Sequence, residues 1–409
     1  MMLNKLGLDN YQTARESVSI LVGPNGSGKS SFLRDLALDH RNDRNIVIVC
    51  NTPHDRFAGL RGALRISVGK TAGSPRVVVK NAVAKSLAGS GSEFYQISSI
   101  LEYCGYQGRF GFRIDPGPLY GKNSREIRSQ LQPTFVKKFD DATYLSLAEA
   151  DGLLGADFEM ALAFLQRHDP LKPLWIDASE KILDFSRSQE FVSVLRLESK
   201  LRSWNVLHGI RVYLQPLNDR GAIEMQYASS GQLALISSLL FLITSVGENP
   251  IVIIDEPENS LHPNWQREYV DKVLTALSYR NATIIMATHA PLVVTGALAN
   301  SLDRVSVFVI RDGVPQRLSI DSSGNSLGSI EEILWRAFNV VTPANHFVSE
   351  QIVDEVSRFE RGEVRKDEVL ALIGKMENES FDGRQQSFFA AVKALLDKVE
   401  VSRETNGGR

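Results

Sequence analysis

The sequence predicts an α/β fold, in which apolar strands alternate with helices around a mixed or largely parallel sheet. Three observations support this prediction. The largely apolar residues 18–22 lead directly into a glycine-rich loop. Residues 251–254 are four consecutive β-branched residues, as in a strand with both faces buried in a covered parallel sheet. Patterns typical of helices and of strands alternate around these two stretches, which favours βαβ connections.

The N-terminal part of the chain is expected to contain mostly strands. A first strand is predicted at residues 15–22, a helix at 29–38 and a second strand at 45–50. Two short β-like runs follow, Ala63–Val68 and Arg76–Val79. We therefore expect a basic, strand-rich segment after the second strand.

The middle of the chain has a helical pattern. Apolar residues recur at helical spacing within 148–167 and 188–201. Pro170 and Pro173 interrupt this pattern between the two stretches, because proline breaks a helix interior. These features predict a helical insertion at residues 118–208.

Strand and helix patterns alternate again after the insertion, and charged helical sequence follows a Ser/Gly-rich stretch at 321–329. Strands are expected at 210–214, 222–227, 251–254, 283–287 and 304–310, and helices from Ser230 and over 263–278. The predicted organisation is a head in two parts, 1–117 and 209–325, the insertion at 118–208 and a helical C-terminal extension at 326–409.

The glycine-rich loop carries the most specific motif. Residues 23–30 read GPNGSGKS and match G-x-x-x-x-G-K-[ST] in full, between a predicted strand and a predicted helix. In such a loop, backbone N–H groups and the helix N-terminus bind phosphates, the lysine reaches the β- and γ-phosphates, and the serine hydroxyl ligates Mg²⁺. The alternative is a surface glycine turn. The predicted nucleotide-binding residues here are Asn25, Gly26, Ser27, Gly28, Lys29, Ser30 and Ser31, with Ser30 also a metal ligand.

Two carboxylates follow the β-branched strand. Asp255 and Glu256 would lie at its carboxyl end, where open α/β sheets bind ligands. Adjacent carboxylates repel each other unless a cation or a polarised water shares the site. We therefore place Asp255 in the Mg²⁺ shell and Glu256 as the base that orients water against a γ-phosphate. The alternative is a pair that only caps the next helix.

The bulk composition is that of a globular chain. Its 409 residues are 43% hydrophobic and 23% charged, which suggests two or three structural units. Two cysteines provide no disulfide framework and no metal spacing, and the N-terminus lacks the apolar core of a signal peptide, so a cytoplasmic location is expected. The longest apolar stretch, residues 233–246, is too short to span a bilayer and is expected to be a buried helix, with no membrane partner.

The net charge of −2 is unevenly distributed. Residues 56–138 contain fourteen Lys or Arg and four acidic residues, so this segment is about +10 and the remainder about −12. Such asymmetry suggests a polyanionic partner, with nucleic acid the first candidate. The alternative is a solvated face that the acidic remainder balances after folding.

Three further motifs point to a family. Residues 227–232, YASSGQ, resemble the signature loop of ABC-type ATPases, in the Ser-Ser-Gly variant of RecF-like and OLD-like members. Residues 258–263, ENSLHP, resemble the D-loop of that group, and residues 287–291, ATHAP, resemble its switch-histidine segment. Because four motifs stand in the family's order over about 15–60 and 210–312, the chain is identified as a member of the SMC-related RecF/OLD-like group.

This resemblance implies an ABC-type P-loop ATPase head, with ATP and Mg²⁺ as its ligands. In the family, two heads sandwich two nucleotides head to tail, and the signature residues of one copy face the γ-phosphate that the other binds. His289 would donate a hydrogen bond to the γ-phosphate or the attacking water, although a histidine after a strand is often a structural residue. The implied catalytic residues are Glu256, His289 and Lys29, and the implied signature contacts are Ser230, Gly231 and Gln232.

One family feature is missing. A glutamine should end a strand after the glycine loop and contact Mg²⁺, but the strand 46–50 runs into Asn51-Thr52-Pro53. Asn51 could substitute chemically, and Gln96 and Gln107 are alternatives. The residue that takes this place is therefore left unassigned.

A finer resemblance concerns two short loops. Residues 51–57, NTPHDRF, and residues 287–291 look like those of the PtuA family, the ATPases of Septu-type anti-phage systems and of some retron systems. In those systems the ATPase acts beside a separate HNH nuclease. The resemblance therefore implies a nuclease as the effector partner.

Several functions are disfavoured. No TOPRIM-like acidic pattern follows the last predicted sheet strand, and the seven histidines are dispersed, so no nuclease site is expected within the chain. The helical segments are too short and too often broken by proline for the long coiled coil of an SMC protein. Three hypotheses remain: an ATPase that gates an effector, expected to be a nuclease, in anti-phage defence; a RecF-like DNA-repair ATPase that acts directly on DNA; and the ATPase subunit of a transporter.

Overall fold

The computed structural model describes most of the chain. The described residues are 2–8, 16–42, 44–52, 55–67, 74–89, 93–135, 155–177, 185–218, 221–311, 313–318, 346–378, 389–397 and 399–400. Predictions for residues 136–154 and 319–345, and for the C-terminal residues 401–409, lie outside this set.

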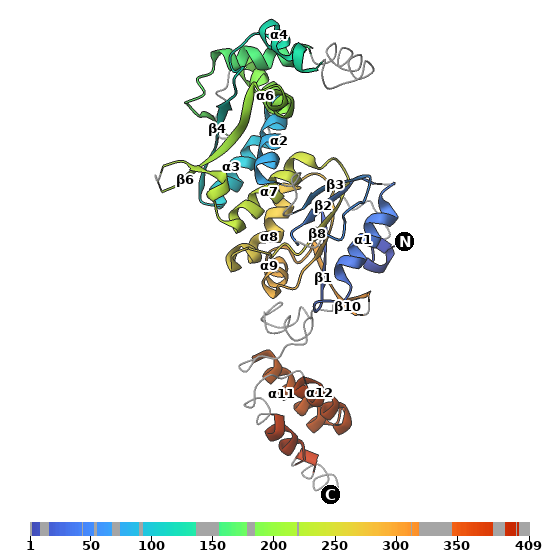
Figure 1. The fold of residues 1–409 in the computed structure, drawn as a ribbon. Coiled ribbons are helices and arrows are strands. Elements are labelled where there is room, and N and C mark those ends of the chain that lie inside the picture. Colours follow the sequence, from blue (N-terminus) through green and yellow to red (C-terminus); the bar gives the residue numbers. More distant parts are fainter. Residues whose placement is uncertain are drawn as a thin grey trace, which may run out of the picture.

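A seven-stranded sheet forms the centre of the head, in the order β11-β10-β1-β9-β8-β2-β3 (Figure 1). All neighbouring strands pair in parallel except β10 and β11, which form an antiparallel pair. The strands are β1 (Ser17–Val22), β2 (Ile46–Cys50), β3 (Ala63–Ser67), β8 (Ile251–Asp255), β9 (Thr283–Ala287), β10 (Val305–Arg311) and β11 (Val314–Arg317). The mixed, mainly parallel sheet confirms the predicted fold class, and six of these strands lie where the sequence predicts them.

Helices cover both faces of this sheet. Side chains alternate between the two faces along each strand, so Ile253 of β8 packs towards α1 (Lys29–His40) with Leu33 and Leu36. Its neighbours Val252 and Ile254 face the opposite side. That side packs against α7 (Ser230–Ser245), α8 (Pro263–Ala276) and α9 (Pro291–Ser301). The apolar stretch at 233–246 therefore lies in a buried helix, as predicted.

A second, antiparallel sheet lies beside the first, in the order β5-β4-β6-β7 (Figure 1). Its strands are β4 (Tyr106–Pro116), β5 (Leu174–Asp177), β6 (Leu207–Pro216) and β7 (Ile223–Glu224). The predicted all-helical character of 118–208 is therefore wrong in part, because β5 lies within that range and pairs with β4. A strand of four residues has no recognisable pattern of its own, and its pairing partner is about sixty residues away in sequence.

Helices pack on one side of the second sheet. They are α2 (Pro75–Ala88), α3 (Glu93–Tyr103) and α6 (Phe185–Ser203), and residues 155–167 and α4 (Ser124–Phe135) are also helical. The prediction of a β-like run at Arg76–Val79 is wrong, because these residues are the first turn of α2. Three consecutive valines favour a strand locally. Burial of Val79, Ala82 and Val83 against α6 and α7 follows the helical period instead.

The C-terminal region is helical where it is described. It contains α11 (His346–Arg361), α12 (Lys366–Asn378) and helical residues 389–397, as expected. Apolar side chains from these three segments form a separate core cluster, including Phe359, Ile373 and Phe389. The division into head, insertion and extension stays a prediction. No helix among the described residues has the length and apolar character needed to cross a membrane.

Candidate functional site

The glycine loop between β1 and α1 adopts a conformation that requires its glycines. Gly23, Gly26 and Gly28 have φ angles of 148°, 84° and 99°. A Cβ atom on Gly23 would lie 2.9 Å from Ser27 Oγ and 3.1 Å from the carbonyl oxygen of Ile310. The loop therefore closes tightly and ends in the first turn of α1, where backbone N–H groups are available to an anion.

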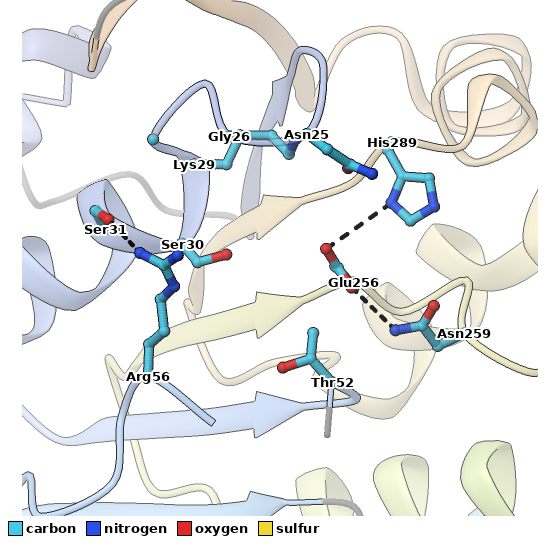
Figure 2. A pocket seen from close by; sticks show the side chains of 11 residues that line it. Asn25, Gly26, Lys29, Ser30, Ser31, Thr52, Arg56, Glu256, Asn259 and His289 are labelled. Carbon is cyan, nitrogen blue, oxygen red and sulfur yellow. Dashed lines mark hydrogen bonds and ion pairs between the residues drawn. The ribbon is translucent and has the colours of Figure 1, made fainter. Parts of the chain in front are cut away.

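A pocket of about 470 Å³ opens at this loop (Figure 2). Strand ends that are distant in sequence surround it, because β1, β9 and β8 are neighbours in the sheet. Among the predicted site residues, those that line the pocket are Asn25, Gly26, Gly28, Lys29, Ser30, Ser31, Glu256 and His289. Thr52, Arg56 and Asn259 complete the lining and were not predicted as site residues.

Lys29 is held at the loop. Its Nζ atom donates hydrogen bonds to the carbonyl oxygens of Gly23 at 2.7 Å and Pro24 at 3.0 Å. Burial lowers the pKa of Lys29, against the opposing effect of the nearby acidic groups, of which Glu256 contributes most. The ammonium group is thus partly desolvated, which strengthens its attraction to a phosphate that enters the pocket.

Asp255, at the end of β8, is buried beneath the pocket and its Oδ1 atom accepts a hydrogen bond from Ser30 Oγ at 3.1 Å. Burial raises the pKa of Asp255 to about 6, and Glu256 and Glu258 add to this effect while Ser30 opposes it. The Ser30 hydroxyl and the Asp255 carboxylate, whose negative charge is not fully balanced by nearby cations, provide two adjacent oxygen ligands. Mg²⁺ prefers oxygen ligands of this kind. The predicted metal ligands, Ser30 and Asp255, are therefore adjacent and fit that ion.

Glu256 has a backbone conformation that is unusual for its residue type. Its φ angle is 51°, in the left-handed region, and its N–H donates to the carbonyl oxygen of Ala287 at 2.9 Å. Its Oε2 atom accepts a hydrogen bond from Asn259 Nδ2 at 3.0 Å, and its Oε1 atom lies 3.9 Å from His289 Nδ1 (Figure 2). Non-glycine residues with positive φ cluster at functional sites. The strand end thus aims this carboxylate into the pocket.

His289 lies in the segment between β9 and α9 and is anchored by Glu258. Glu258 Oε1 accepts hydrogen bonds from the backbone N–H of His289 at 2.7 Å and from its Nδ1 at 2.9 Å. These bonds raise the pKa of His289, and burial opposes the change. Sequence reasoning placed Glu258 only at the start of the D-loop-like segment. The only signal in the sequence for the contact of Glu258 with His289 is that an acidic residue stands three positions after the end of β8.

The signature-like segment lies at the N-terminus of α7 and does not line the pocket of its own chain. Ser229 caps the helix by accepting a hydrogen bond from the backbone N–H of Gln232, which in turn caps Ser229. Gln232 also donates to the carbonyl oxygen of Cys104 at 2.9 Å and accepts from the hydroxyl of Tyr106 at 2.7 Å. Its side chain thus ties α7 to the second sheet, and its predicted contact with nucleotide stays a prediction.

Comparison with known proteins supports an ATPase. Residues 121–295, less than half of the chain, match the family described as "AAA domain, putative AbiEii toxin, Type IV TA system". The matched range includes the signature-like segment, the carboxylates after β8 and His289. This partial match is consistent with the resemblance of the motifs to those of ABC-type ATPases.

Two curated proteins are similar to parts of this chain. Protein ea59 of Escherichia phage lambda is 24% identical over 220 residues, which are 50% of this chain and 40% of that protein. The "Retron Vc95 probable ATPase" of Vibrio cholerae serotype O1 biovar El Tor is 27% identical over 157 residues, which are 36% of this chain and 25% of that protein. The chain therefore spans less than half the length of either relative.

The matches among solved structures include heads of SMC proteins. The head domain of an Smc protein with an extended coiled coil, bound to the C-terminal domain of ScpA from Pyrococcus furiosus, has a TM-score of 0.28 and is 13% identical. That comparison covers 75% of this chain and 90% of the other.

None of the three residues considered for the missing glutamine, Asn51, Gln96 and Gln107, lines the pocket among the residues that the structure describes. Asn51 follows β2, and its side chain lies 3.5 Å from the carbonyl oxygen of Pro257 rather than in the pocket lining. Thr52, the next residue, lines the pocket. Gln96 and Gln107 lie in α3 and β4, which belong to the second sheet and its helices.

The basic segment 56–138 is dispersed over several helices and strands. Arg56 donates to Ser31 Oγ at 2.8 Å beside the nucleotide pocket. Other cations of this segment are used within the protein, since Lys80 pairs with Glu198 and Lys85 donates to a backbone carbonyl oxygen. Sequence charge alone therefore overstates the positive surface of this segment, and Lys70, Lys137 and Lys138 lie outside the described residues.

Proposed function

We propose that the chain binds MgATP in the pocket at the glycine loop and hydrolyses it. One observation carries this proposal: the phosphate-binding loop, the Ser30–Asp255 pair, Glu256 and His289 meet around a single pocket although they are far apart in sequence. A pocket of about 470 Å³ is within the range that small-molecule ligands occupy. ATP and Mg²⁺ are therefore the proposed substrate and cofactor.

Each residue has a defined part in this proposal. The loop N–H groups and Lys29 bind the phosphates, and Ser30 with Asp255 would hold the magnesium ion. Bound there, magnesium would neutralise charge on the phosphate oxygens. Glu256 accepts a hydrogen bond from the attacking water and orients it. His289 donates from Nε2 to the γ-phosphate or to that water.

The proposed catalytic unit is a head-to-tail dimer. Ser230 is exposed at the first position of α7 and does not line the pocket of its own chain. A second copy could therefore contact the γ-phosphate through Ser230 and Gly231, since a helix N-terminus favours an anion. Each copy would supply the contacts that the other pocket lacks.

The biological role that we propose is to gate an effector protein in cytoplasmic anti-phage defence. The similarity to a probable retron ATPase and the PtuA-like loops support this role. The effector that fits best is a separate nuclease of the HNH type, acting beside the ATPase. An ATPase that acts directly on DNA, as in RecF-like repair, stays the second hypothesis.

The enzymatic part is tested with Glu256→Gln. The variant should lose at least 99% of ATP turnover and still bind ATP, because the amide cannot act as the base. Light scattering should then show an ATP-dependent dimer, whereas wild type returns to monomer after hydrolysis. A variant that binds ATP and stays monomeric would contradict the dimer proposal. Full turnover in the variant would contradict the assignment of Glu256.

The biological part needs the native host. A tagged chain should co-purify with a nuclease in an ATP-dependent manner, and loss of either gene should abolish phage protection. A chain that protects alone, or that restores DNA repair without any nuclease, would favour the second hypothesis.

A further inference from the structure

A second pocket, of about 350 Å³, lies where α6 ends and β6 begins, outside the nucleotide site. It is lined by Ser199, Arg202 and Ser203 of α6 and by Leu207 and His208 of β6. Two hydroxyls, a guanidinium and an imidazole are all groups that can donate hydrogen bonds to an anion.

The pocket continues into an exposed cationic stripe along α6. Arg196, Ser199, Lys200 and Ser203 are three or four residues apart and therefore share one side of the helix. Arg196, Lys200 and Arg202 are exposed. Glu198 is the single acidic residue between 191 and 208.

Glu198 is already engaged. It accepts a hydrogen bond from Lys80 Nζ at 2.7 Å and another from the backbone N–H of Ile210 at 3.1 Å. Its charge therefore offsets that of Lys80, which α2 holds against α6. The cations of the stripe keep their full positive field towards solvent.

Helix α2 adds a further cation from another element. Burial lowers the pKa of Lys80, and after the opposing effect of Glu198, the charges of Arg76 and Arg202 lower it further. Arg76, one turn before Lys80 on α2, and Arg202, on the neighbouring helix α6, thus both lower the pKa of Lys80. Like charges gathered in this way repel each other, and a bound polyanion would relieve the repulsion.

The helix dipole explains only part of this arrangement. Basic residues in the last turn of a helix are stabilised by its C-terminal carbonyl groups. That effect accounts for Lys200 and Arg202, which lie in the last turn of α6. It does not account for Arg76, which comes from α2, or for the open pocket with its two serine hydroxyls.

We propose that this α6 cationic surface, made of Arg76, Arg196, Ser199, Lys200, Arg202 and Ser203, binds the phosphodiester backbone of a duplex nucleic acid. The eight residues of helix from Arg196 to Ser203 span about 10 Å, the axial distance of about three phosphates on one strand. The cations contact phosphates in succession, and Ser199 donates a hydrogen bond, whereas the Ser203 hydroxyl already donates to the carbonyl oxygen of Lys200 at 2.8 Å. Binding is independent of base sequence, because phosphate contacts position a duplex without reading it.

This inference deepens the proposed function by naming the surface that contacts nucleic acid, yet it does not depend on the chemistry at Glu256. The test uses the full chain and a fluorescein-labelled 30-base-pair DNA, followed by anisotropy between 50 and 200 mM salt. With four cations on phosphates, the logarithm of the association constant should fall with a slope of about −3.6 against the logarithm of salt concentration.

The double variant Lys200→Glu with Arg202→Glu should weaken DNA binding at least tenfold and reduce the slope by about 2. The neutral pair Arg196→Gln with Arg202→Gln serves if the charge reversal impairs folding, and it should weaken binding at least fivefold. Arg41→Glu, an exposed reversal at the end of α1, is the matched control and should stay within twofold of wild type. ATP turnover should be unchanged in all three variants.

Two results would overturn the inference. One is wild-type protein that hydrolyses ATP but does not bind the duplex. The other is equal weakening by Arg41→Glu and by the α6 variants. A third result would separate the two proposals. If the protein shows no ATPase activity but binds DNA in a salt-dependent way that the α6 variants lose, the α6 cationic surface is supported and only the proposed function is contradicted.

Discussion

Glu258 Oε1 binds His289 at two points, the backbone N–H at 2.7 Å and the ring Nδ1 at 2.9 Å. Because Nδ1 carries the proton that Glu258 accepts, Nε2 can donate to a phosphate only when the ring is protonated and both nitrogens carry hydrogen. The same pair raises the pKa of His289, which keeps the ring protonated nearer to neutral pH. Glu258 is therefore a positioning residue that also sets the charge of the histidine.

Substitution of Glu258 should separate these two effects. Glu258→Gln keeps an oxygen acceptor for both N–H groups, so kcat should fall less than fivefold at pH 6. Glu258→Ala removes the anchor, and kcat should fall about 10- to 100-fold with KM for ATP within twofold of wild type. Steady-state ATPase assays check both values. An equal fall of kcat in the two variants would mean that Glu258 does not act by orienting His289.

The pH profile gives a second prediction. In wild type, kcat should decrease as the pH rises through the raised pKa of His289, above the ordinary value of 6.5. In Glu258→Gln the carboxylate charge is lost, so the same decrease should begin at lower pH. The charges that bear on the ring are Glu258, Glu256 and Lys29, and the last two are present in both proteins. Superimposable profiles would remove Glu258 from this account.

Asp255→Asn should stabilise the protein while abolishing its response to MgATP. A pKa raised from 3.8 to about 6 means that the charged carboxylate costs up to about 3 kcal/mol at pH 7.5. The native state binds the proton more tightly than the unfolded state, so the cost falls as pH drops through 6 and disappears near 4. Urea unfolding at pH 7.5 and pH 4 measures the difference. Asp39→Asn, at an exposed position of α1, is the control and should change little.

Ser230→Arg should prevent the contact of α7 with the nucleotide of a second copy, without changing nucleotide binding in its own pocket. The side chain is exposed and lies outside its own pocket, so ATP binding by one protomer should be unchanged, whereas hydrolysis should fall below 1% of wild type. Fluorescent nucleotide titration and turnover assays report the two properties separately. Thr275→Arg, an exposed change on α8, should leave both unaffected. Loss of nucleotide binding in Ser230→Arg would show that the segment acts within its own chain.

Gly231→Ala should destabilise the head because α7 packs directly on the backbone of the D-loop-like segment. The new Cβ atom would lie 2.3 Å from the carbonyl oxygen of Ser260. Overpacking of this kind costs about 1–3 kcal/mol. Gly209→Ala, where a Cβ atom meets nothing within 4 Å, should cost less than 0.5 kcal/mol by the general behaviour of open sites. Thermal unfolding of both variants compares them directly.

The elements that carry the nucleotide pocket could be predicted from sequence because their signals are local. The GPNGSGKS loop needs particular residues at consecutive positions, and β8 is a continuous apolar run. The second sheet could not be predicted in full. In residues 109–115 of β4, buried apolar residues alternate with charged residues or glycine, and this pattern indicates a strand. By contrast, β5 is a strand only because it pairs with β4. Three consecutive valines in α2 predict a strand, but packing of this segment against α6 and α7 stabilises a helix.

By itself, the sequence determined the residue types of the candidate site, their order along the chain and the strands that precede them. Only the tertiary structure decided which groups act on each other. The sheet order brings the ends of β1, β9 and β8 together, and this places Glu258 on His289 and Ser30 on Asp255. Packing of α2 against α6 also brings cations of these two helices near each other. Hydrogen bonds and electrostatic effects depend on distances of a few ångströms, and distances between remote segments exist only once the chain has folded.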